Sequence, residues 1–386
     1  MKYIILLFIS PFILKAQDYK PVVEANNSFG LDLCYGISST SDHLLSPISI
    51  SSAIAMTYVG ALGETKDQMK KVFYYPEDLK LNAGFSDISK ILSQPFKSSS
   101  VSIANKLWVG DGRVNLNPDF VSINQQYYSA ALETLNFDDP NESSKTINNW
   151  VSSNTNNKIN ELIDPSSIGS DVILILTNAV YFKSNWKKKF DPSLTTAGKF
   201  ATDKDEKIDV SYMFNKGSFN HYEDDIVRVI ELPYEGDDFS FLLLLPRTTM
   251  DILEDRLTNE NYSSWILNMR PREFDEVRFP KFRNSFRIEL SKVLKDMGMT
   301  NAFNGSAQFE GIGNSPRGKM TLSKVIHQSF IEVNEEGTEA AAATGVVVVA
   351  RSAPGRFIVD RPFIYAIRHV KTNTLLFIGK ASNPKY

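Results

Sequence analysis

The segment with the strongest structural signal in this sequence reads Glu335-Glu336-Gly337-Thr338-Glu339-Ala340-Ala341-Ala342-Ala343-Thr344-Gly345-Val346-Val347-Val348-Val349-Ala350-Arg351-Ser352. Its alanines are strong helix formers, whereas its β-branched valines favour a pleated strand, so no single local state suits both halves. In a strand, alternate residues from 338 to 348 would form one uncharged face that is suited to burial.

The residues that follow this segment, Ala353-Pro354-Gly355-Arg356, are typical of an exposed turn. The pattern therefore predicts a segment that is exposed in one state and inserted into a sheet in another. An ordinary core strand followed by a loop is the alternative, because periodicity assigns short apolar runs poorly.

The run from Asn334 to Thr344 resembles the reactive-loop hinge of inhibitory serpins. Other motifs of that family occur in the family's order, namely Ser46-Pro47-Ile48-Ser49-Ile50, Asn148-Asn149-Trp150-Val151, Thr177-Asn178-Ala179-Val180-Tyr181-Phe182-Lys183, Glu231-Leu232-Pro233-Tyr234, Phe279-Pro280-Lys281-Phe282, His327, Asp360-Arg361-Pro362-Phe363 and Gly379-Lys380-Ala381-Ser382-Asn383-Pro384. Asp42, Ser184 and Lys324 depart from the family's usual Asn, Gly and Asp, which affects local hydrogen bonds and not the fold. The resemblance implies an α+β serpin fold, in which helices pack around a large mixed main sheet and smaller sheets, with an exposed reactive loop at about residues 335–356.

Residues 17–386 are expected to form a single serpin domain, since no Gly/Ser/Pro-rich linker interrupts them. Apolar runs such as residues 173–176 predict a sheet that is covered on both faces. We expect helices at residues 148–163 and 286–297, and a helix that begins at Pro47 with the Ser46 hydroxyl as its cap. Strands are predicted at residues 101–108, 172–182, 226–232, 239–245, 357–359, 363–368 and 374–378.

Residues 1–16 have the pattern of a secretory signal peptide, with a basic start, a short apolar run and Ala16 before the expected cleavage site. We therefore expect a secreted, extracellular protein. Four Asn-x-Ser sequons are candidate glycosylation sites, at Asn26, Asn141, Asn261 and Asn304. The single cysteine, Cys34, excludes an intramolecular disulfide and lies in a helical pattern that favours a small buried residue over a reactive thiol.

The composition argues against several other functions. A formal net charge of −3 gives no sign of a nucleic-acid binder. The one basic region contains Arg270, Arg272, Arg278, Lys281, Arg283 and Arg287, but acidic residues interrupt it, which favours a solvated face over a glycosaminoglycan site. The four histidines form no metalloprotease motif, and no Gly-x-Ser-x-Gly elbow occurs. We therefore expect no cofactor, no metal site, no membrane partner and no catalytic residues.

The serpin resemblance also implies a mechanism and a set of site residues. A serine protease attacks the loop and forms an acyl-enzyme, after which the freed hinge inserts into the main sheet and distorts the protease. The hinge consists of Glu335, Gly337, Thr338, Glu339, Ala340, Ala341, Ala342 and Ala343. The residues that match the family's polar cluster beneath the main sheet, where two strands must separate, are Ser46, Ser49, Asn178 and His327.

The reactive bond is predicted between Arg351 and Ser352, because in this family the scissile residue usually lies sixteen positions after the first hinge glutamate, here Glu335. The guanidinium of Arg351 can pair with a carboxylate at the base of a trypsin-type pocket. Arg356 is the competing basic residue and is disfavoured because it follows Pro354-Gly355.

These features together predict a monomeric suicide-substrate inhibitor that forms a covalent complex with a trypsin-like serine protease. A non-inhibitory serpin that acts as a carrier or folding assistant is the alternative. Such members usually have bulky, charged or proline residues at the inward hinge positions, and this hinge has none there. A serine hydrolase ranks third, since the nucleophile elbow is missing.

Overall fold

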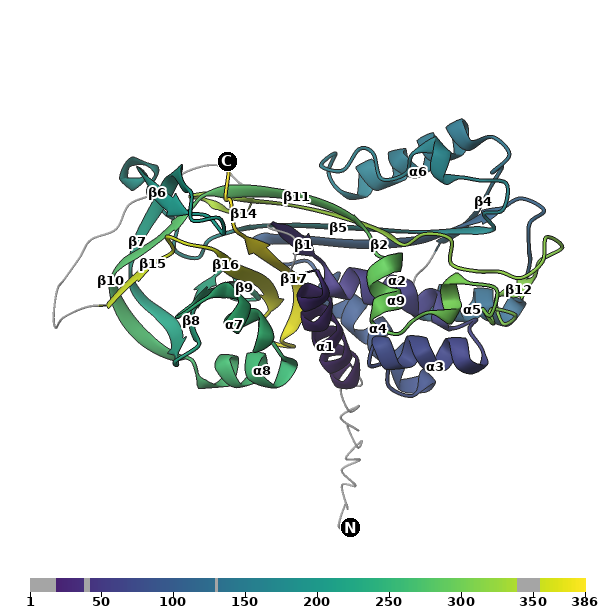
Figure 1. Ribbon diagram of the computed structural model, residues 1–386, viewed down its shortest axis with the longest axis horizontal. Coiled ribbons are helices and arrows are strands. Elements are labelled where there is room, and N and C mark those ends of the chain that lie inside the picture. Colours follow the sequence, from purple (N-terminus) through teal and green to yellow (C-terminus); the bar gives the residue numbers. More distant parts are fainter. Residues whose placement is uncertain (1–18, 38–41, 129–130, 339–354) are drawn as a thin grey trace, which may run out of the picture.

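The computed structural model describes residues 19–37, 42–128, 131–338 and 355–386. Its helices lie in three places, and α6 (Pro140–Asn154) stands apart from the others (Figure 1). Most of the others lie together, namely α1 (Lys20–Gly36), α2 (Pro47–Tyr58), α3 (Gly63–Val72), α4 (Asp78–Leu92), α5 (Pro118–Tyr128) and, from later in the chain, α9 (Ser291–Asp296). Two further helices, α7 (Met250–Asp255) and α8 (Asn259–Asn268), pack on a sheet of nine described strands.

The main sheet of the described residues has six strands in the order β11-β13-β14-β5-β2-β4. Their bounds are β11 Phe282–Glu289, β13 Ile326–Val333, β14 Gly337–Thr338, β5 Leu174–Asn185, β2 Ser99–Gly110 and β4 Ala131–Leu135. Helix α6 lies over one face of this sheet and α2 lies under the other (Figure 1). The apolar run at residues 173–176 fits a sheet covered on both faces, whereas the edge strand β11 alternates between more buried and more exposed residues.

A second sheet of nine described strands has the order β1-β17-β16-β9-β8-β7-β10-β15, and β6 also pairs with β7. Their bounds are β1 His43–Leu45, β17 Thr374–Ala381, β16 Phe363–His369, β9 Phe239–Pro246, β8 Val227–Pro233, β7 Lys207–Glu223, β10 Arg270–Pro280, β15 Gly355–Ile358 and β6 Thr196–Ala201. Strands β9, β16 and β17 are buried along their whole length, so they form the centre of the core. A further small sheet pairs β12 (Gly313–Asn314) with β3 (Asn115–Leu116).

Helix α2 connects the two large sheets, because it packs on β5 and β2 of the main sheet and on β17 of the second one. Every residue of α2 is buried, and its small Ser and Ala residues allow close approach from several sides. Pro47 begins the helix as predicted, where its missing N–H leaves no intrahelical hydrogen bond unmade. The Ser46 side chain makes no capping hydrogen bond, so that part of the prediction is wrong.

Two predicted helices also need correction. Residues 286–289 belong to strand β11, whose exposure alternates from residue to residue, and only Ser291–Asp296 is helical. The helix predicted at residues 148–163 begins earlier, at Pro140, where the Asp139 side chain accepts a hydrogen bond from Glu142 N at 3.1 Å. It ends at Asn154, because the next residues include Asn156 and Asn157 in the left-handed backbone region. Among the described helices, none is long and apolar enough to cross a membrane.

Candidate functional site at the opening of the main sheet

At one end of the main sheet, β13 and β5 are the strands between which the predicted hinge would enter, and we call this end the entry point. Among the described residues, the two-residue strand β14 alone joins these strands, with Thr338 opposite Val333 of β13 and Ser184 of β5. Strand β14 is antiparallel to both neighbours. The hinge predicted from the sequence therefore begins inside the sheet, and an extension of β14 would lie between β13 and β5.

The backbone before β14 is held by the chain that follows β5. Trp186 N donates to Glu336 O at 2.8 Å, and Phe190 N donates to Glu335 O at 2.8 Å. The Trp186 ring nitrogen donates to Asn334 O, also at 2.8 Å. Gly337 is required by space, since a Cβ atom at this position would lie 2.1 Å from Ser184 O.

Thr338 occupies a closed site at the end of β14. Its side chain is 1% exposed, and its Oγ1 lies 2.5 Å from the Tyr234 hydroxyl. The Tyr234 ring stacks on Trp186, with a centroid distance of 4.7 Å. A small uncharged residue fits here, and a bulky or charged one would have to displace this aromatic pair.

The carboxylate of Glu335 fixes the base of the hinge. Its Oε1 accepts a hydrogen bond from Thr195 Oγ1 at 2.8 Å and pairs with Lys281 Nζ at 3.3 Å. Lys281 follows β10, and its ammonium group also lies 4.6 Å from the centre of the Tyr386 ring. The Glu335 side chain therefore attaches the hinge to Thr195 and to Lys281, and Lys281 in turn contacts Tyr386 near the end of the chain.

The predicted sheet-opening residues form two hydrogen-bonded pairs further along β5 and β13, where Asn178 and His327 are each six residues from the residue that lies opposite Thr338. Ser49 Oγ donates to Asn178 Oδ1, and Asn178 Nδ2 donates to Ser49 O at 2.9 Å. Ser46 N donates to the Nε2 atom of His327 at 3.2 Å. Since Asn178 is on β5 and His327 is on β13, α2 holds both strands that flank the opening.

His327 is buried and neutral. Burial lowers its pKa to about 3, so the imidazole carries no charge near neutral pH and can accept the Ser46 hydrogen bond. Among the described atoms, Ser46 Oγ and His327 Nδ1 have no hydrogen-bond partner. Ser46 thus contributes through its backbone, whereas the sequence pointed to its side chain.

Two further site residues were missed by the sequence analysis. Asn105 on β2 donates to Ser52 Oγ at 2.9 Å and accepts a hydrogen bond from Asn178 Nδ2, which extends the polar cluster to a third strand. The sequence signal that could have identified Asn105 is its amide side chain within a strand-like segment that contains many apolar residues. Tyr234 was recognised as part of a family motif, but its contact with Thr338 spans 104 residues and has no local sequence signature.

Several predicted residues lie outside the described part of the chain or outside this site. Hinge residues Glu339, Ala340, Ala341, Ala342 and Ala343 and the bond between Arg351 and Ser352 are in the first group. The basic residues singled out from the sequence are divided between the two large sheets and are largely paired, for example Arg278 with Glu276 at 2.7 Å and Arg283 with Glu332 at 3.1 Å.

The sequons differ in exposure. Asn26 is fully buried in α1, and its Nδ2 donates to Leu375 O at 3.2 Å, so a glycan on this nitrogen cannot be accommodated and Asn26 is withdrawn as a candidate. Asn141 and Asn304 are exposed and Asn261 is partly exposed, and they stay predictions. Cys34 is buried as expected, and burial raises its thiol pKa to about 12.

Comparison with known proteins places the chain in a family. The family model described as "Serpin (serine protease inhibitor)" matches residues 24–384, so the chain belongs to the serpin family. An uncharacterized serpin-like protein of Methanosarcina acetivorans is 36% identical over 372 residues, covering 95% of this chain and 87% of that protein. The leukocyte elastase inhibitor of Xenopus laevis is 36% identical over 359 residues, covering 90% of this chain and 94% of that protein. The native structure of the thermophilic serpin tengpin superposes with a TM-score of 0.86 at 29% identity, covering 94% of each chain.

Proposed function

We propose that this serpin inhibits trypsin-like serine proteases as a suicide substrate and traps them by inserting its cleaved loop between β13 and β5. The observation that carries this proposal is β14, where Gly337 and Thr338 are seated between these two strands. After Glu339, the hinge residues Ala340 to Ala343 are small enough to continue this strand in a covered sheet.

The proposed reaction begins as ordinary proteolysis. The protease serine attacks the carbonyl carbon of Arg351, the bond to Ser352 breaks, and the new amino terminus leaves with the proton that the protease supplies. The protease is then esterified to Arg351. If the hinge inserts before water hydrolyses this ester, the enzyme is carried away from the entry point and remains bound.

Insertion is favourable because the loop gains a ladder on both sides. About a dozen inserted residues gain hydrogen bonds worth about 1 kcal/mol each, and each buried valine contributes about 1.5 to 3 kcal/mol. The α2 contacts through Ser49 and Ser46 must yield as the strands separate. These are few hydrogen bonds compared with those of the new ladder.

Arg351 is proposed as the scissile residue in preference to Arg356. Arg356 lies in β15, and its Nε pairs with the carboxylate of Glu276 on β10. A protease would have to break this pair and detach β15 in order to bind Arg356. The basic residue at position 351 fits a trypsin-type pocket, which is the reason for the proposed target class.

The test is incubation with a panel of trypsin-like and chymotrypsin-like proteases, followed by a denaturing gel. A stable complex with the trypsin-like enzymes is expected, and mass spectrometry should find a released fragment that begins at Ser352. A fragment that begins at Phe357 would overturn the reactive bond. Cleavage without any covalent complex would favour the non-inhibitory carrier or folding assistant.

We also propose that the protein is secreted as a monomer after removal of residues 1–16. The basic and apolar pattern of this leader supports secretion, and the exposed sequons at Asn141 and Asn304 are compatible with it. Amino-terminal sequencing of protein recovered from the culture medium tests the leader, and recovery only from the cell lysate with an intact leader would contradict it. The molar mass of the purified protein, measured by light scattering, tests whether it is a monomer.

A further inference from the structure

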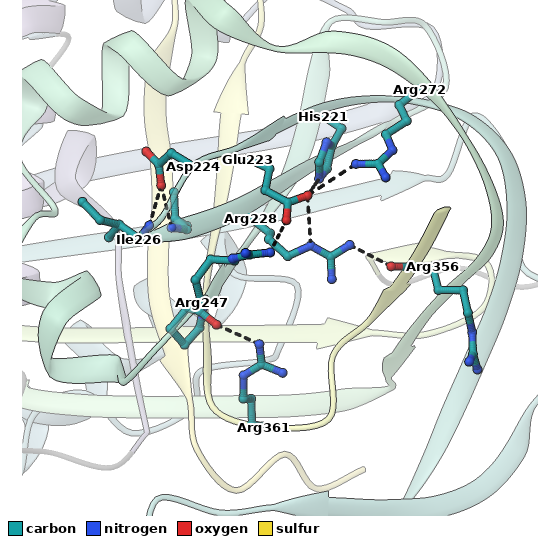
Figure 2. A network of polar contacts seen from close by, with 11 residues as sticks. His221, Glu223, Asp224, Ile226, Arg228, Arg247, Arg272, Arg356 and Arg361 are labelled. Carbon is teal, nitrogen blue, oxygen red and sulfur yellow. Dashed lines mark hydrogen bonds and ion pairs between the residues drawn. The ribbon is translucent and has the colours of Figure 1, made fainter. Parts of the chain in front are cut away.

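Three arginines surround a single carboxylate on the surface of the second sheet (Figure 2). Glu223 ends β7, and its side chain pairs with Arg247 after β9, with Arg272 of β10 at 3.3 Å and with Arg228 of β8 at 3.6 Å. The side chains of Arg247 and Arg272 are 44% and 48% exposed. We call these three arginines the arginine surface.

Among the described residues, Glu223 is the one carboxylate that forms ion pairs with these three guanidinium groups. The next acid, Asp224, points into the turn, where its Oδ1 accepts hydrogen bonds from Ile226 N at 2.7 Å and from Val227 N at 2.8 Å, and the exposed Asp225 follows it in the chain. Further away, Asp360 pairs with Arg361 at 2.8 Å. The outer N–H groups of Arg247 and Arg272 therefore remain the best available anion contacts.

The lowered pKa of the neighbouring His221 is consistent with a positive electrostatic potential at the arginine surface. His221 Nε2 lies 3.7 Å from a Glu223 oxygen, which by itself would favour a protonated ring. Its pKa is nevertheless lowered to about 4, first by burial and then by Arg272 and Arg228. The ring is neutral near pH 7 and does not add to the charge.

This surface lies directly beside the end of the reactive loop. A terminal nitrogen of Arg272 is 3.1 Å from the position that a Cβ atom on Gly355 would occupy, and Arg228 donates to Arg356 O at 2.7 Å. Gly355 is three residues after Ser352, so the two Cα atoms are separated by at most about 11 Å. A protease domain of about 200 residues has a radius of gyration of about 16 Å, so a protease docked on this bond extends as far as the arginine surface.

We propose that the arginine surface is an exosite for an acidic loop that flanks the active site of the target protease. This inference rests on the proposed inhibitory function. Carboxylates of the protease would pair with the outer N–H groups of Arg247 and Arg272, and Arg228 would stay paired with Glu223 beneath them. Such contacts at an exposed rim act mainly on the association rate and on its salt dependence.

The test is the double variant Arg247→Gln and Arg272→Gln, which retains Arg228 to neutralise Glu223. Lys145→Gln is the matched control, because Lys145 is 68% exposed, pairs with Glu142 and lies on α6, far from this surface (Figure 1). Second-order inhibition rates are measured at low and physiological salt. Two trypsin-like proteases are used, one with acidic and one with basic loops beside the primed side of its active site.

With the acidic protease, the double variant should associate about tenfold more slowly at low salt, with a weaker salt dependence. The rate with the basic protease should not fall, and the stoichiometry of inhibition should be unchanged. Equal rates for wild type and variant with both proteases would overturn the exosite. A double variant that keeps its rates but loses retention on a sulfated-polysaccharide column would assign the surface to that polymer instead. Absence of covalent complexes for the wild type would instead refute the proposed function itself.

Thermal unfolding separates these effects from damage to the fold. The double variant and the control should unfold within a few degrees of the wild type, because each lost pair is at least partly exposed. If the double variant unfolds much earlier, the single variant Arg272→Gln is tested in its place. It should then retain part of the rate loss with the acidic protease, and a wild-type rate would reject the exosite.

Discussion

Replacing Thr338 by arginine tests whether the reactive loop enters the main sheet by extending β14. The threonine side chain is 1% exposed, and its hydroxyl lies 2.5 Å from that of Tyr234. An unpaired guanidinium in this site would cost several kcal/mol, so an arginine at position 338 should stay outside the sheet before cleavage and meet this cost only when the loop inserts. A cost of about 3 kcal/mol slows insertion by about a hundredfold, since about 1.4 kcal/mol corresponds to a factor of ten.

Slow insertion changes the outcome of the encounter because it competes with hydrolysis of the acyl-enzyme. The Thr338→Arg variant should therefore be cleaved at a normal rate while covalent complex is lost. The stoichiometry is measured by titrating trypsin with each variant, and the complex is followed on a denaturing gel. Thr338→Ser is the control, since it keeps a hydroxyl for Tyr234 and adds no charge. A folded Thr338→Arg variant that forms complex at wild-type yield would refute insertion at this position.

Three other predictions test the hinge, the reactive bond and the buried histidine. Glu335→Gln removes the charge that pairs with Lys281, so denaturant titration should show a free energy of unfolding lower by about 1–2 kcal/mol, and an unchanged value would show that the pair does not stabilise the hinge. Arg351→Ala should abolish inhibition of trypsin-like proteases whereas Arg356→Ala leaves it nearly intact, and the reverse result would move the reactive bond. Because burial lowers the pKa of His327 to about 3, the unfolded chain binds the proton first, so stability should fall as the pH decreases from about 6.5 toward 3. His327→Gln should reduce that slope, and equal slopes would assign the acid sensitivity to other groups.

Much of the fold could be predicted from the sequence, because long apolar runs and family motifs agreed with each other. The strand expected at residues 239–245 is β9, Phe239–Pro246, and every residue of it is buried. The error at residues 286–297 has a physical reason. Phe286 and Ile288 alternate as in a strand, while Leu290, Val293 and Leu294 follow at helical spacing, so one apolar run contains both periods. The boundary depends on pairing with β13, which the local sequence does not encode.

Most residues of the candidate site could be predicted from the sequence, but the hydrogen bonds that join them could not. Ser49, Asn178 and His327 were identified, and the structure places them where the start of α2 meets β5 and β13. The strands to which they belong are separated by more than a hundred residues of sequence, so the pairing of each with α2 could be learned only from the fold. The Ser46 hydroxyl was expected to cap α2 and does not, and the residue instead contacts His327 through its backbone N–H.

On the proposed mechanism, the contacts around α2 would keep the main sheet closed before cleavage and yield when the loop inserts. The helix is fixed to the second sheet by its packing on β17, and it reaches β5 through Ser49 and β13 through Ser46. Separation of β5 from β13 must therefore break or stretch at least one of these contacts, at about 1 kcal/mol for each hydrogen bond. On the proposed mechanism this cost is small beside the stabilisation from about a dozen ladder hydrogen bonds, so it would affect the rate of opening and not the final state. Weakening the α2 contacts should consequently speed insertion of the cleaved loop, and it should equally speed opening of the uncleaved sheet.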